Sequence, residues 1–353
     1  MKKDEMTASE RFGAYLQGKP VDRAPVVEWA PWWVQTVERW LRDGLPREAS
    51  GYEALQDYFG LDHCIQTHSS ALTGQTPRPP AFGHGIMENA DDYHTKIKPT
   101  LFPDPEGILP QARVDYLKAT RERGDTVHFF TVQGSFWFPR QLLGIENHLY
   151  GFYDQPELYH ELVEDLAVWQ EKVLRCAFER FSFDFVTFEE DMSYNGGPMI
   201  SEEQFRVFIA PLYERLVPVI REYKIPIIID SDGDITKAVD WYGSVGADGM
   251  LPLERQAGVD VSVYLKKQPA MAFLGHFDKM CMKYGEKAMR KEFERLLPSM
   301  LRGKLIPSVD HQTPPDVSLD TYRVYVSLLK EYASMVKHDD GTILPCPTFA
   351  DNE

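Results

Sequence analysis

The sequence predicts an α/β protein that folds as a single (β/α)8 barrel of the TIM type with an extended N-terminal region. First, strand and helix patterns alternate along the chain and give about eight strands, most of them followed by a helix. Second, acidic or histidine side chains follow several strands at their carboxyl ends, where such barrels hold their active sites. An open, doubly wound sheet is the alternative, but it usually carries a glycine-rich first turn, which this sequence lacks.

Each element is predicted from the spacing of its apolar residues and from the residues that punctuate it. Ser201 with Gln204, for example, forms the pattern of a capping box at the start of a helix. The predicted order is helix 8–17, strand 25–29, helix 34–42, strand 62–67, long loop 69–104, helix 109–123, strand 126–133, helix 154–181, strand 183–189, helix 201–223, strand 225–229, helix 234–245, strand 248–253, strand 269–274, helix 286–302, strand 304–309 and helix 318–336. We expect one domain over 1–353, with a poorly ordered tail at 338–353.

Composition narrows the class of function. The chain has 353 residues, of which 43% are hydrophobic, so it can bury a large core. Its formal net charge of −16 argues against a nucleic-acid surface, which needs a basic stripe. No apolar run approaches the ~20 residues of a membrane span, and no secretory signal is visible. Scattered cysteines fit a reducing compartment, and we expect a cytoplasmic enzyme that acts on a small molecule.

The stretch 225–234 places acidic side chains directly after a strand. Its first half, Ile225 to Ile229, is uncharged and reads as a strand that is buried on both faces. Asp230 and Asp232 follow, and residues two apart in an extended chain point to the same side. We therefore expect these two carboxylates to project together from the carboxyl end of the strand.

Other predicted strands end in the same way. The polar groups at strand ends are Glu189-Glu190-Asp191, Asp230 with Asp232, His276 with Asp278 and Lys279, and Asp310-His311. In a barrel these ends share one face, so the side chains would converge. Several carboxylates with histidine form the donor set of a hard divalent metal, and they also suit acid–base chemistry.

Three segments resemble the uroporphyrinogen decarboxylase superfamily, which includes the decarboxylase and the corrinoid-dependent methyltransferases. They are ERFGAYLQGKPVDRAPV at 10–26, GGPMISEEQFRVFIAPLYERLVPVIREYKIPIII at 196–229 and PPDVSLDTYRVYVSLLKEY at 314–332. The resemblance implies the barrel fold and, by analogy with the decarboxylases, a homodimer. It covers nearly the whole chain.

The chain departs from the decarboxylase pattern at the substrate loop. The decarboxylase holds the carboxylates of its substrate with an arginine-rich R-Q-A-G-R loop after the first strand. Here that place reads Glu28-Trp29-Ala30-Pro31-Trp32-Trp33, which is acidic and aromatic. The resemblance is therefore closest in type to the methyltransferase branch.

The methyltransferase branch holds zinc with an H-x-C-G motif and a distant cysteine before Pro-Pro. Asp230, Asp232 and His311 stand at the matching positions, and Glu190 stands near a carboxylate that can complete the site. The resemblance thus implies a divalent metal held by Asp230, Asp232, His311 and Glu190. The metal would be zinc or another transition metal. Because carboxylate ligands are harder than thiolates, such a site would bind zinc less selectively and would also suit Mn, Fe(II) or Mg.

We therefore expect a methyltransferase that moves a methyl group between a small methylated substrate and a corrinoid supplied by a partner protein. The catalytic candidates are Asp232, Glu190 and His311, and the substrate-binding candidates are Trp29, Trp33, Trp137, Arg140, Tyr194, His276 and Lys279. One alternative is a lyase that decarboxylates a small acid other than uroporphyrinogen, with Arg140 or Lys279 as the cationic anchor. Another is a corrinoid- or tetrapyrrole-binding protein without turnover.

Overall fold

The computed structural model describes residues 5–336, so the tail predicted at 338–353 lies outside the described residues. The strands are β1 (His63–His68), β2 (Thr126–Gln133), β3 (Phe185–Glu189), β4 (Ser193–Tyr194), β5 (Gly197–Pro198), β6 (Ile227–Asp230), β7 (Gly249–Leu251), β8 (Ala272–Phe277) and β9 (Leu305–Val309). The main sheet has seven strands in the order β1-β2-β3-β6-β7-β8-β9, and β4 pairs with β5. The fold is α/β and of the TIM-barrel type, as predicted.

The helices alternate with these strands over most of the chain. They are α1 (Ala8–Leu16), α2 (Val34–Arg42), α3 (Tyr52–Phe59), α4 (Ala90–Asp92), α5 (Pro105–Ile108), α6 (Gln111–Arg123), α7 (Trp137–Leu143), α8 (Ile145–Asp154), α9 (Pro156–Arg180), α10 (Glu202–Gln204), α11 (Ala210–Glu222), α12 (Ala238–Ser244), α13 (Val261–Lys267), α14 (Glu286–Leu301) and α15 (Leu319–Met335). Among the described residues, no helix combines the length and the apolar character needed to cross a membrane.

One of the eight predicted strands is wrong. The segment 25–29 is extended but joins no ladder, and the other seven predicted strands are present. Val26 is paired with one residue instead of a strand: its N–H donates to the Asp62 carboxylate at 2.9 Å, and its carbonyl accepts from the Asp62 N–H at 2.8 Å. Pro25 has no N–H to offer a neighbouring strand, which removes a second ladder bond.

The described residues group into two compact units. Unit 1 contains residues 5–65, 123–127 and 250–336, and unit 2 contains residues 66–122 and 128–249. The expectation of one domain over the whole chain stays a prediction, and each unit is described by itself below.

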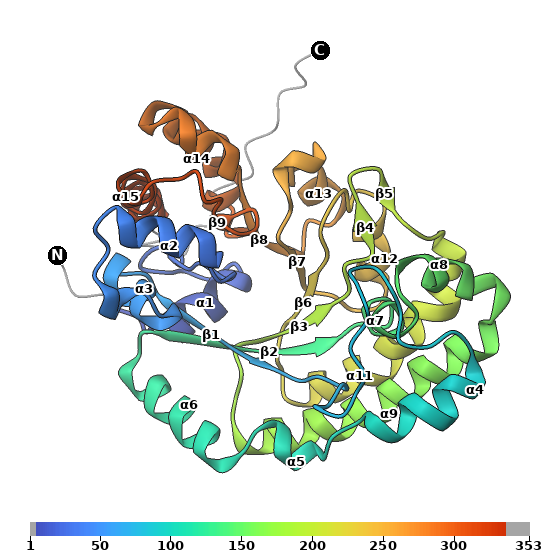
Figure 1. The fold of residues 1–353 in the computed structure, drawn as a ribbon. Helices are drawn as coiled ribbons and strands as arrows, with labels where there is room; N and C mark the ends of the chain where they lie inside the picture. The colour runs from blue at the N-terminus through green and yellow to red at the C-terminus, as the bar shows by residue number, and fades with distance from the viewer. Residues whose placement is uncertain (1–4, 337–353) are drawn as a thin grey trace. The chain divides into compact units, whose positions relative to one another are not determined.

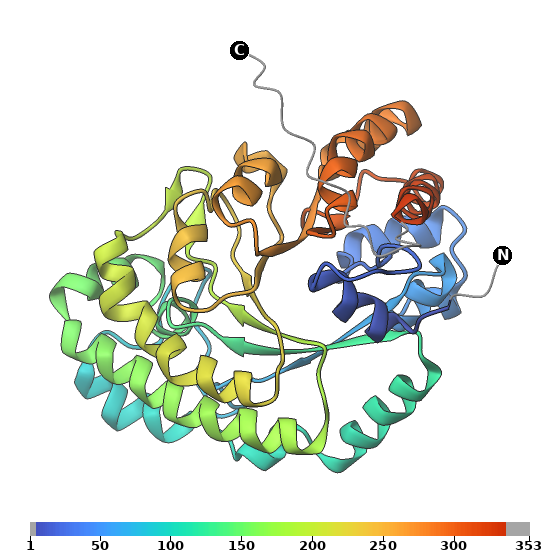
Figure 2. The same ribbon diagram turned by 180° about the vertical axis from the view of Figure 1, so that it is seen from behind.

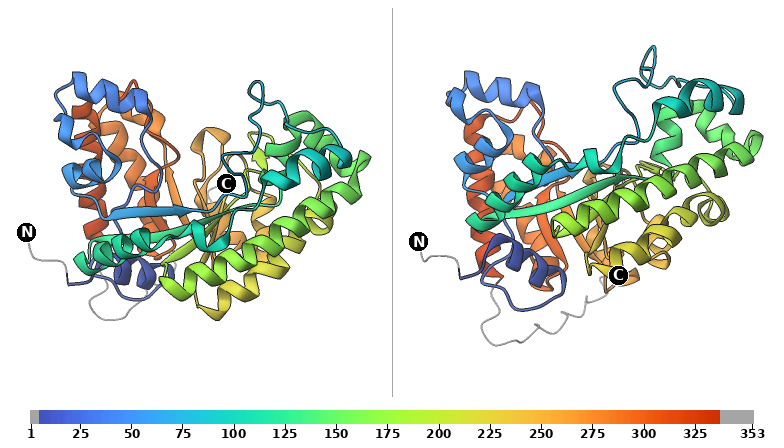
Figure 3. Two further views of the ribbon diagram at one scale, coloured as in Figure 1. Left: turned by 60° about the horizontal axis from the view of Figure 1, so that its bottom comes forward. Right: turned by 90° about the horizontal axis from the view of Figure 1, so that it is seen from below.

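Unit 2 carries the parallel strands β2, β3 and β6. Their register aligns Gln133 with Glu189, and Glu189 with Asp230. Helices α9 and α11 run side by side along one face of these strands (Figure 1, Figure 2 and Figure 3). Phe188 of β3 points to that face, because its ring lies 4.7 Å from the ring of Tyr213 on α11. Side chains one position away on β3 therefore face away from α11.

Unit 1 contains the parallel pair β8 and β9, with α14 and α15 packed together (Figure 1). The tryptophans of the N-terminal region join an aromatic cluster with α15. Trp40 lies 4.6 Å from Tyr322, and its indole N–H donates to the Val317 carbonyl at 3.0 Å. Trp32 contacts the same two rings, so core packing accounts for two of the tryptophans in this region.

Candidate functional site

A polar face forms on unit 2, on the side of the strands that faces away from α11. We define the polar face as Gln66, His68, Thr131, Gln133, Thr187, Glu189 and Asp230. Below it, Phe129 and Phe185 stack at 4.8 Å. The face therefore changes along the strands from apolar to neutral polar and then to charged, and the charged layer lies at the carboxyl ends.

The charged layer contains a histidine–carboxylate pair. His68 Nε2 lies 3.2 Å from a Glu189 carboxylate oxygen, and their side chains are 40% and 31% exposed. Asp230 is the register partner of Glu189, so its side chain is on the same face. These groups are accessible to a small molecule.

Glu190 lies on the opposite face and is fully buried. Its carboxylate accepts hydrogen bonds from the Ser135 N–H at 3.1 Å, the Phe136 N–H at 2.7 Å and the Tyr213 hydroxyl at 2.9 Å. Burial raises its pKa to about 7, against the lowering effect of these bonds. The predicted catalytic and metal-binding carboxylate thus anchors the loop after β2 to α11.

The loop after β2 also brings Arg140 to the strand ends. Its guanidinium lies 3.1 Å from the Asp191 carboxylate and 4.9 Å from the centre of the Trp137 ring. The Asp191 N–H donates to the Asp230 carbonyl at 3.2 Å, which ties the ends of β3 and β6 together. The predicted binding residues Trp137 and Arg140 therefore lie beside each other.

The loop after β6 packs closely on β4. Gly233 has a φ of 78°, and a Cβ there would come within 2.6 Å of the Tyr194 backbone, so glycine is required. The Asp234 N–H donates to the Tyr194 carbonyl at 2.9 Å. Asp232 is half-buried in this loop, and the Tyr194 side chain is 57% exposed.

In unit 1, Asp310 at the end of β9 is fully buried. It accepts hydrogen bonds from the Arg255 N–H at 2.8 Å and the Gln256 amide at 2.9 Å, and it lies 3.3 Å from the Lys279 ammonium. Burial raises the pKa of this carboxyl to about 6, although Lys279 opposes the shift. Lys279 is thus already paired with a carboxylate of the protein.

His276 is a structural histidine. Its side chain is buried, its Nδ1 lies 2.9 Å from the Leu253 carbonyl, and its Nε2 accepts from the Val261 N–H at 3.1 Å. Burial lowers its pKa to about 4, so the ring is neutral at physiological pH. Both nitrogens are used by the protein, which leaves this predicted binding residue no group to offer a substrate.

Trp29 and His311 lie together in unit 1, with ring centroids 6.4 Å apart. The neighbouring Glu28 is buried and accepts from the Tyr325 hydroxyl at 2.6 Å and the Ser308 hydroxyl at 2.7 Å. Burial raises the pKa of Glu28 to about 7. Glu28 therefore fixes the segment that carries Trp29, whereas Trp33 is 43% exposed.

The donor set of the predicted metal is not assembled within the described chain. Among residues 5–336, no group of three or more His, Cys, Asp and Glu side chains is arranged to hold a metal ion. In unit 2 the Glu190 oxygens are occupied by protein donors. The metal set Asp230, Asp232, His311 and Glu190 stays a prediction.

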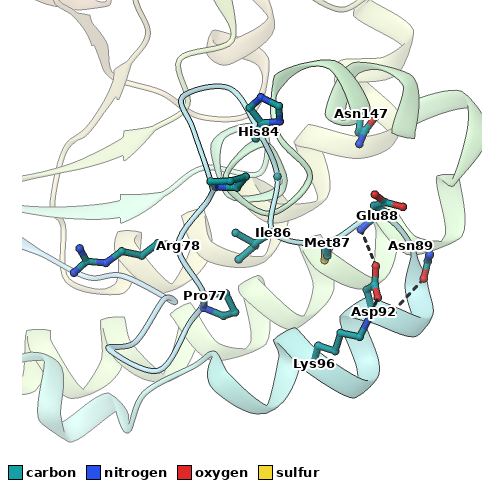
Figure 4. A pocket seen from close by; sticks show the side chains of 12 residues that line it. Pro77, Arg78, His84, Ile86, Met87, Glu88, Asn89, Asp92, Lys96 and Asn147 are labelled. Atoms are coloured by element: carbon teal, nitrogen blue, oxygen red, sulfur yellow. Dashed lines mark hydrogen bonds and ion pairs between the residues drawn. The ribbon is translucent and has the colours of Figure 1, made fainter.

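A hollow of about 740 Å³ also occurs in unit 2 (Figure 4). It is lined by Pro77, Arg78, Pro80, His84, Gly85, Ile86, Met87, Glu88, Asn89, Asp92, Lys96 and Asn147, which include no predicted site residue. Figure 4 shows that the side chains of Arg78, His84 and Lys96 point in different directions. The polar groups that do meet there, Glu88, Asn89 and Lys96, are bonded to Asp92 of the protein itself. We therefore place the candidate site at the strand ends.

Of the seven residues of the polar face, only Asp230 is a predicted site residue. Glu189 is predicted only as an acid at a strand end, and Gln66, His68, Thr131, Gln133 and Thr187 are not predicted as site residues. The signal was available in the alternation of β3, where Glu189 and Glu190 must point to opposite faces. His68 needed the pairing of β1 and β3 with β2, which lies between them and which local sequence does not give.

Comparisons with known proteins agree with the fold. A family model described as uroporphyrinogen decarboxylase (URO-D) matches residues 79–332. A methyltransferase from Methanosarcina mazei has a TM-score of 0.63 at 14% identity, with 93% of this chain and 99% of that chain covered.

Two glycosidase-like structures match less well. A candidate α-galactosidase from Bacteroides fragilis has 13% identity and a TM-score of 0.34, covering 89% of this chain and 61% of that chain. A candidate α-L-fucosidase from Bacteroides thetaiotaomicron has 15% identity and a TM-score of 0.35, covering 89% and 95%. At these TM-scores they carry no argument, and no curated protein matches the chain. Because the family model spans well over half of the sequence, the chain belongs to the uroporphyrinogen decarboxylase family.

Proposed function

We propose that the protein is a methyltransferase of a corrinoid-dependent system. It moves a methyl group between a small methylated substrate and the corrinoid of a partner protein. Family membership and a fold shared with the Methanosarcina mazei methyltransferase support this proposal. At 14% identity the second likeness concerns the fold, so the choice of reaction rests on the side chains.

The main support for the proposal is that the two cationic side chains at the strand ends, Arg140 and Lys279, are already paired with carboxylates of the protein. Arg140 is paired with Asp191 at 3.1 Å, and Lys279 is paired with Asp310 at 3.3 Å. These two side chains are the cationic anchors that a decarboxylase would need for a carboxylate substrate. Because each already neutralises a carboxylate of the protein, a polyacidic substrate would have to displace those pairs. A neutral or cationic methylated substrate fits better.

The charged layer of the polar face suits the departing group. When the methyl carbon leaves an oxygen or nitrogen of the substrate, that atom keeps the electron pair and needs a proton or a hydrogen bond. His68, held by Glu189 at 3.2 Å, can supply either one to an atom that lies over β3. The corrinoid of the partner would accept the methyl group, and the reverse transfer would use the same contacts.

The proposal is tested by single-turnover methyl transfer to free cob(I)alamin, followed by the absorbance of the corrinoid. Methoxybenzene, 4-methoxyphenol and tetramethylammonium serve as neutral and cationic donors, and methoxyacetate serves as an anionic donor. We expect transfer from a neutral or cationic donor at a rate above that of free cob(I)alamin alone.

Two results would contradict the proposal. One is a rate equal to the protein-free control with every donor. The other is release of CO2 from small carboxylic acids without methyl transfer, which would favour the lyase.

A further inference from the structure

The middle layer of the polar face, which consists of Gln66, Thr131 and Thr187, contains a hydroxyl hydrogen without an acceptor among the described residues. The Gln66 amide donates to the Thr131 hydroxyl at 2.8 Å, and the Thr131 and Thr187 hydroxyl oxygens lie 2.6 Å apart. The contact between the two threonines uses one of their two hydroxyl hydrogens. Whichever threonine donates, one hydrogen is left over. Among the described residues no further acceptor for either hydroxyl is found.

This spare donor is costly unless something accepts it. Thr131 and Thr187 are 2% and 3% exposed, so bulk water does not reach their hydroxyl groups freely. A buried donor left without a partner is destabilising, because it has lost its hydrogen bond to water and gained none in the protein. The interior layers of TIM barrels are usually filled by bulky branched apolar side chains, which makes a hydroxyl pair at this position unusual.

The position of the pair indicates what accepts the hydrogen. Gln66, which bonds to Thr131, is exposed at one end of the row, so this end is the side from which a small molecule would approach the two buried threonines. The charged layer with His68 and Glu189 lies two residues further along the same strands, about 6–7 Å away. The two substituent atoms of a para-disubstituted benzene ring are separated by a similar distance.

We propose that Gln66, Thr131 and Thr187 form a binding subsite for an oxygen of a neutral substrate. This substrate oxygen accepts the spare hydroxyl hydrogen. If the oxygen belongs to a hydroxyl group, that group also donates its own hydrogen to the side-chain carbonyl of Gln66. The methyl-bearing atom of the same molecule then lies beside His68 and Glu189. This inference rests on the proposed function, which identifies the methyl-bearing atom as the reacting end of the substrate. It adds that the substrate is neutral and carries a second oxygen at the far end of the molecule.

The test measures binding without any methyl acceptor, by calorimetry or by ligand-observed NMR. The probes are 4-methoxyphenol, 2-methoxyphenol and methoxybenzene, which differ only in the presence and position of one hydroxyl group. For the wild-type protein we expect 4-methoxyphenol to bind about 3- to 10-fold more tightly than methoxybenzene, the value of one neutral hydrogen bond. The ortho isomer should show little of this preference, because its hydroxyl cannot reach the middle layer.

Since either threonine can hold the spare hydrogen, the variant removes both hydroxyls, as Thr131→Val with Thr187→Val. The preference for 4-methoxyphenol should disappear, and the double serine variant, which keeps both hydroxyls, should retain it. The matched control is Thr120→Val, because Thr120 is 1% exposed and its hydroxyl bonds to the Leu117 carbonyl at 2.9 Å, away from the polar face. Gln66→Leu, an exposed substitution with little risk to folding, should also weaken the preference.

The proposal is overturned if the double valine variant and Gln66→Leu keep the wild-type preference. It is also overturned if wild-type protein binds the three probes equally or binds none. If the double variant does not fold, Gln66→Leu and the ortho–para comparison decide. Binding with the expected preference but no methyl transfer would refute the proposed function and leave this subsite in place.

Discussion

A shift of one position along β3 changes the chemistry of a carboxylate in this protein. Glu189 is partly exposed on the polar face beside His68, whereas Glu190 is fully buried against α11. The two residues have the same side chain, so their difference comes only from the direction in which the strand points them. Burial and four hydrogen bonds make Glu190 a structural group, and exposure makes Glu189 available to a substrate.

The raised pKa of Glu190 predicts a pH-dependent contribution to stability. Between its ordinary value of 4.5 and about 7, the folded protein binds this proton more tightly than the unfolded chain. The free energy of unfolding should therefore fall as the pH rises through this range, by on the order of 2–3 kcal/mol. Glu190→Gln cannot bind this proton. Urea unfolding at pH 5 and pH 7.5 should therefore show a smaller fall in its free energy of unfolding than in that of the wild type. An equal fall in the variant would contradict the assignment.

His148 predicts the opposite slope. It is 1% exposed, its ring lies 4.3 Å from Phe136, and within residues 5–336 neither ring nitrogen has a hydrogen-bond partner. Burial lowers its pKa to about 3, so below pH 6.5 the unfolded chain takes up a proton that the folded protein refuses. Stability should fall by on the order of 3 kcal/mol as the pH drops from 7 to 4. His148→Phe should reduce this loss, and acid unfolding curves that coincide with wild type would refute the argument.

At the scale of elements, the strands were predictable because each is a short apolar run with polar punctuation. The capping box of Ser201 and Gln204 is confirmed, with the Gln204 N–H donating to the Ser201 hydroxyl at 3.2 Å. The predicted helix 154–181 is present as α9 (Pro156–Arg180), which starts at a proline, whereas α8 (Ile145–Asp154) just before it was not predicted. Segment 25–29 failed as a strand because its Val26 N–H bonds to the Asp62 side chain and its carbonyl to a single backbone N–H, so no ladder forms.

The candidate site was predictable to the same extent. Acids at the ends of β3 and β6 follow from the local pattern, and both are where the sequence placed them. Which acid faces a substrate depends on the pairing of β1, β2 and β3, and the His68–Glu189 contact joins residues 121 positions apart. Burial of His276 and pairing of Lys279 with Asp310 also arise from tertiary packing, so no local motif reveals them.

The junction between β2 and α7 offers a test at this scale. A Cβ on Gly134 would lie 2.3 Å from the Glu190 carboxyl carbon, a distance that packed side chains do not tolerate. Gly134→Ala should therefore displace Glu190 and lower the free energy of unfolding by on the order of 2–4 kcal/mol. Gly107→Ala, whose added Cβ meets nothing within 4 Å, is the matched control and should leave stability nearly unchanged.

The measurement is urea unfolding of both variants and of Gly134→Ala combined with Glu190→Gln. Because the two residues share one contact, the double variant should lose less free energy of unfolding than the sum of the two single losses. Full additivity, or equal stability of Gly134→Ala and Gly107→Ala, would show that Glu190 does not depend on the space above Gly134.

At the scale of the whole molecule, the family is established and the reaction is proposed. A TIM-type fold supports many reactions, so membership of the uroporphyrinogen decarboxylase family does not by itself choose between methyl transfer and decarboxylation. The net charge of −16 and the paired cations Arg140 and Lys279 both disfavour polyacidic substrates. The corrinoid partner, the metal, the homodimer and the cytoplasmic location stay predictions of the resemblance and the composition.

The most direct test of the central claim compares Glu189→Gln with Glu190→Gln in single-turnover methyl transfer to cob(I)alamin. We expect Glu189→Gln to keep the wild-type unfolding curve and to lose methyl transfer by on the order of 100-fold, because the polar face no longer holds His68 in place. Glu190→Gln should change stability more than the rate of transfer. Wild-type transfer by Glu189→Gln, together with loss of transfer by a fully folded Glu190→Gln, would contradict the account.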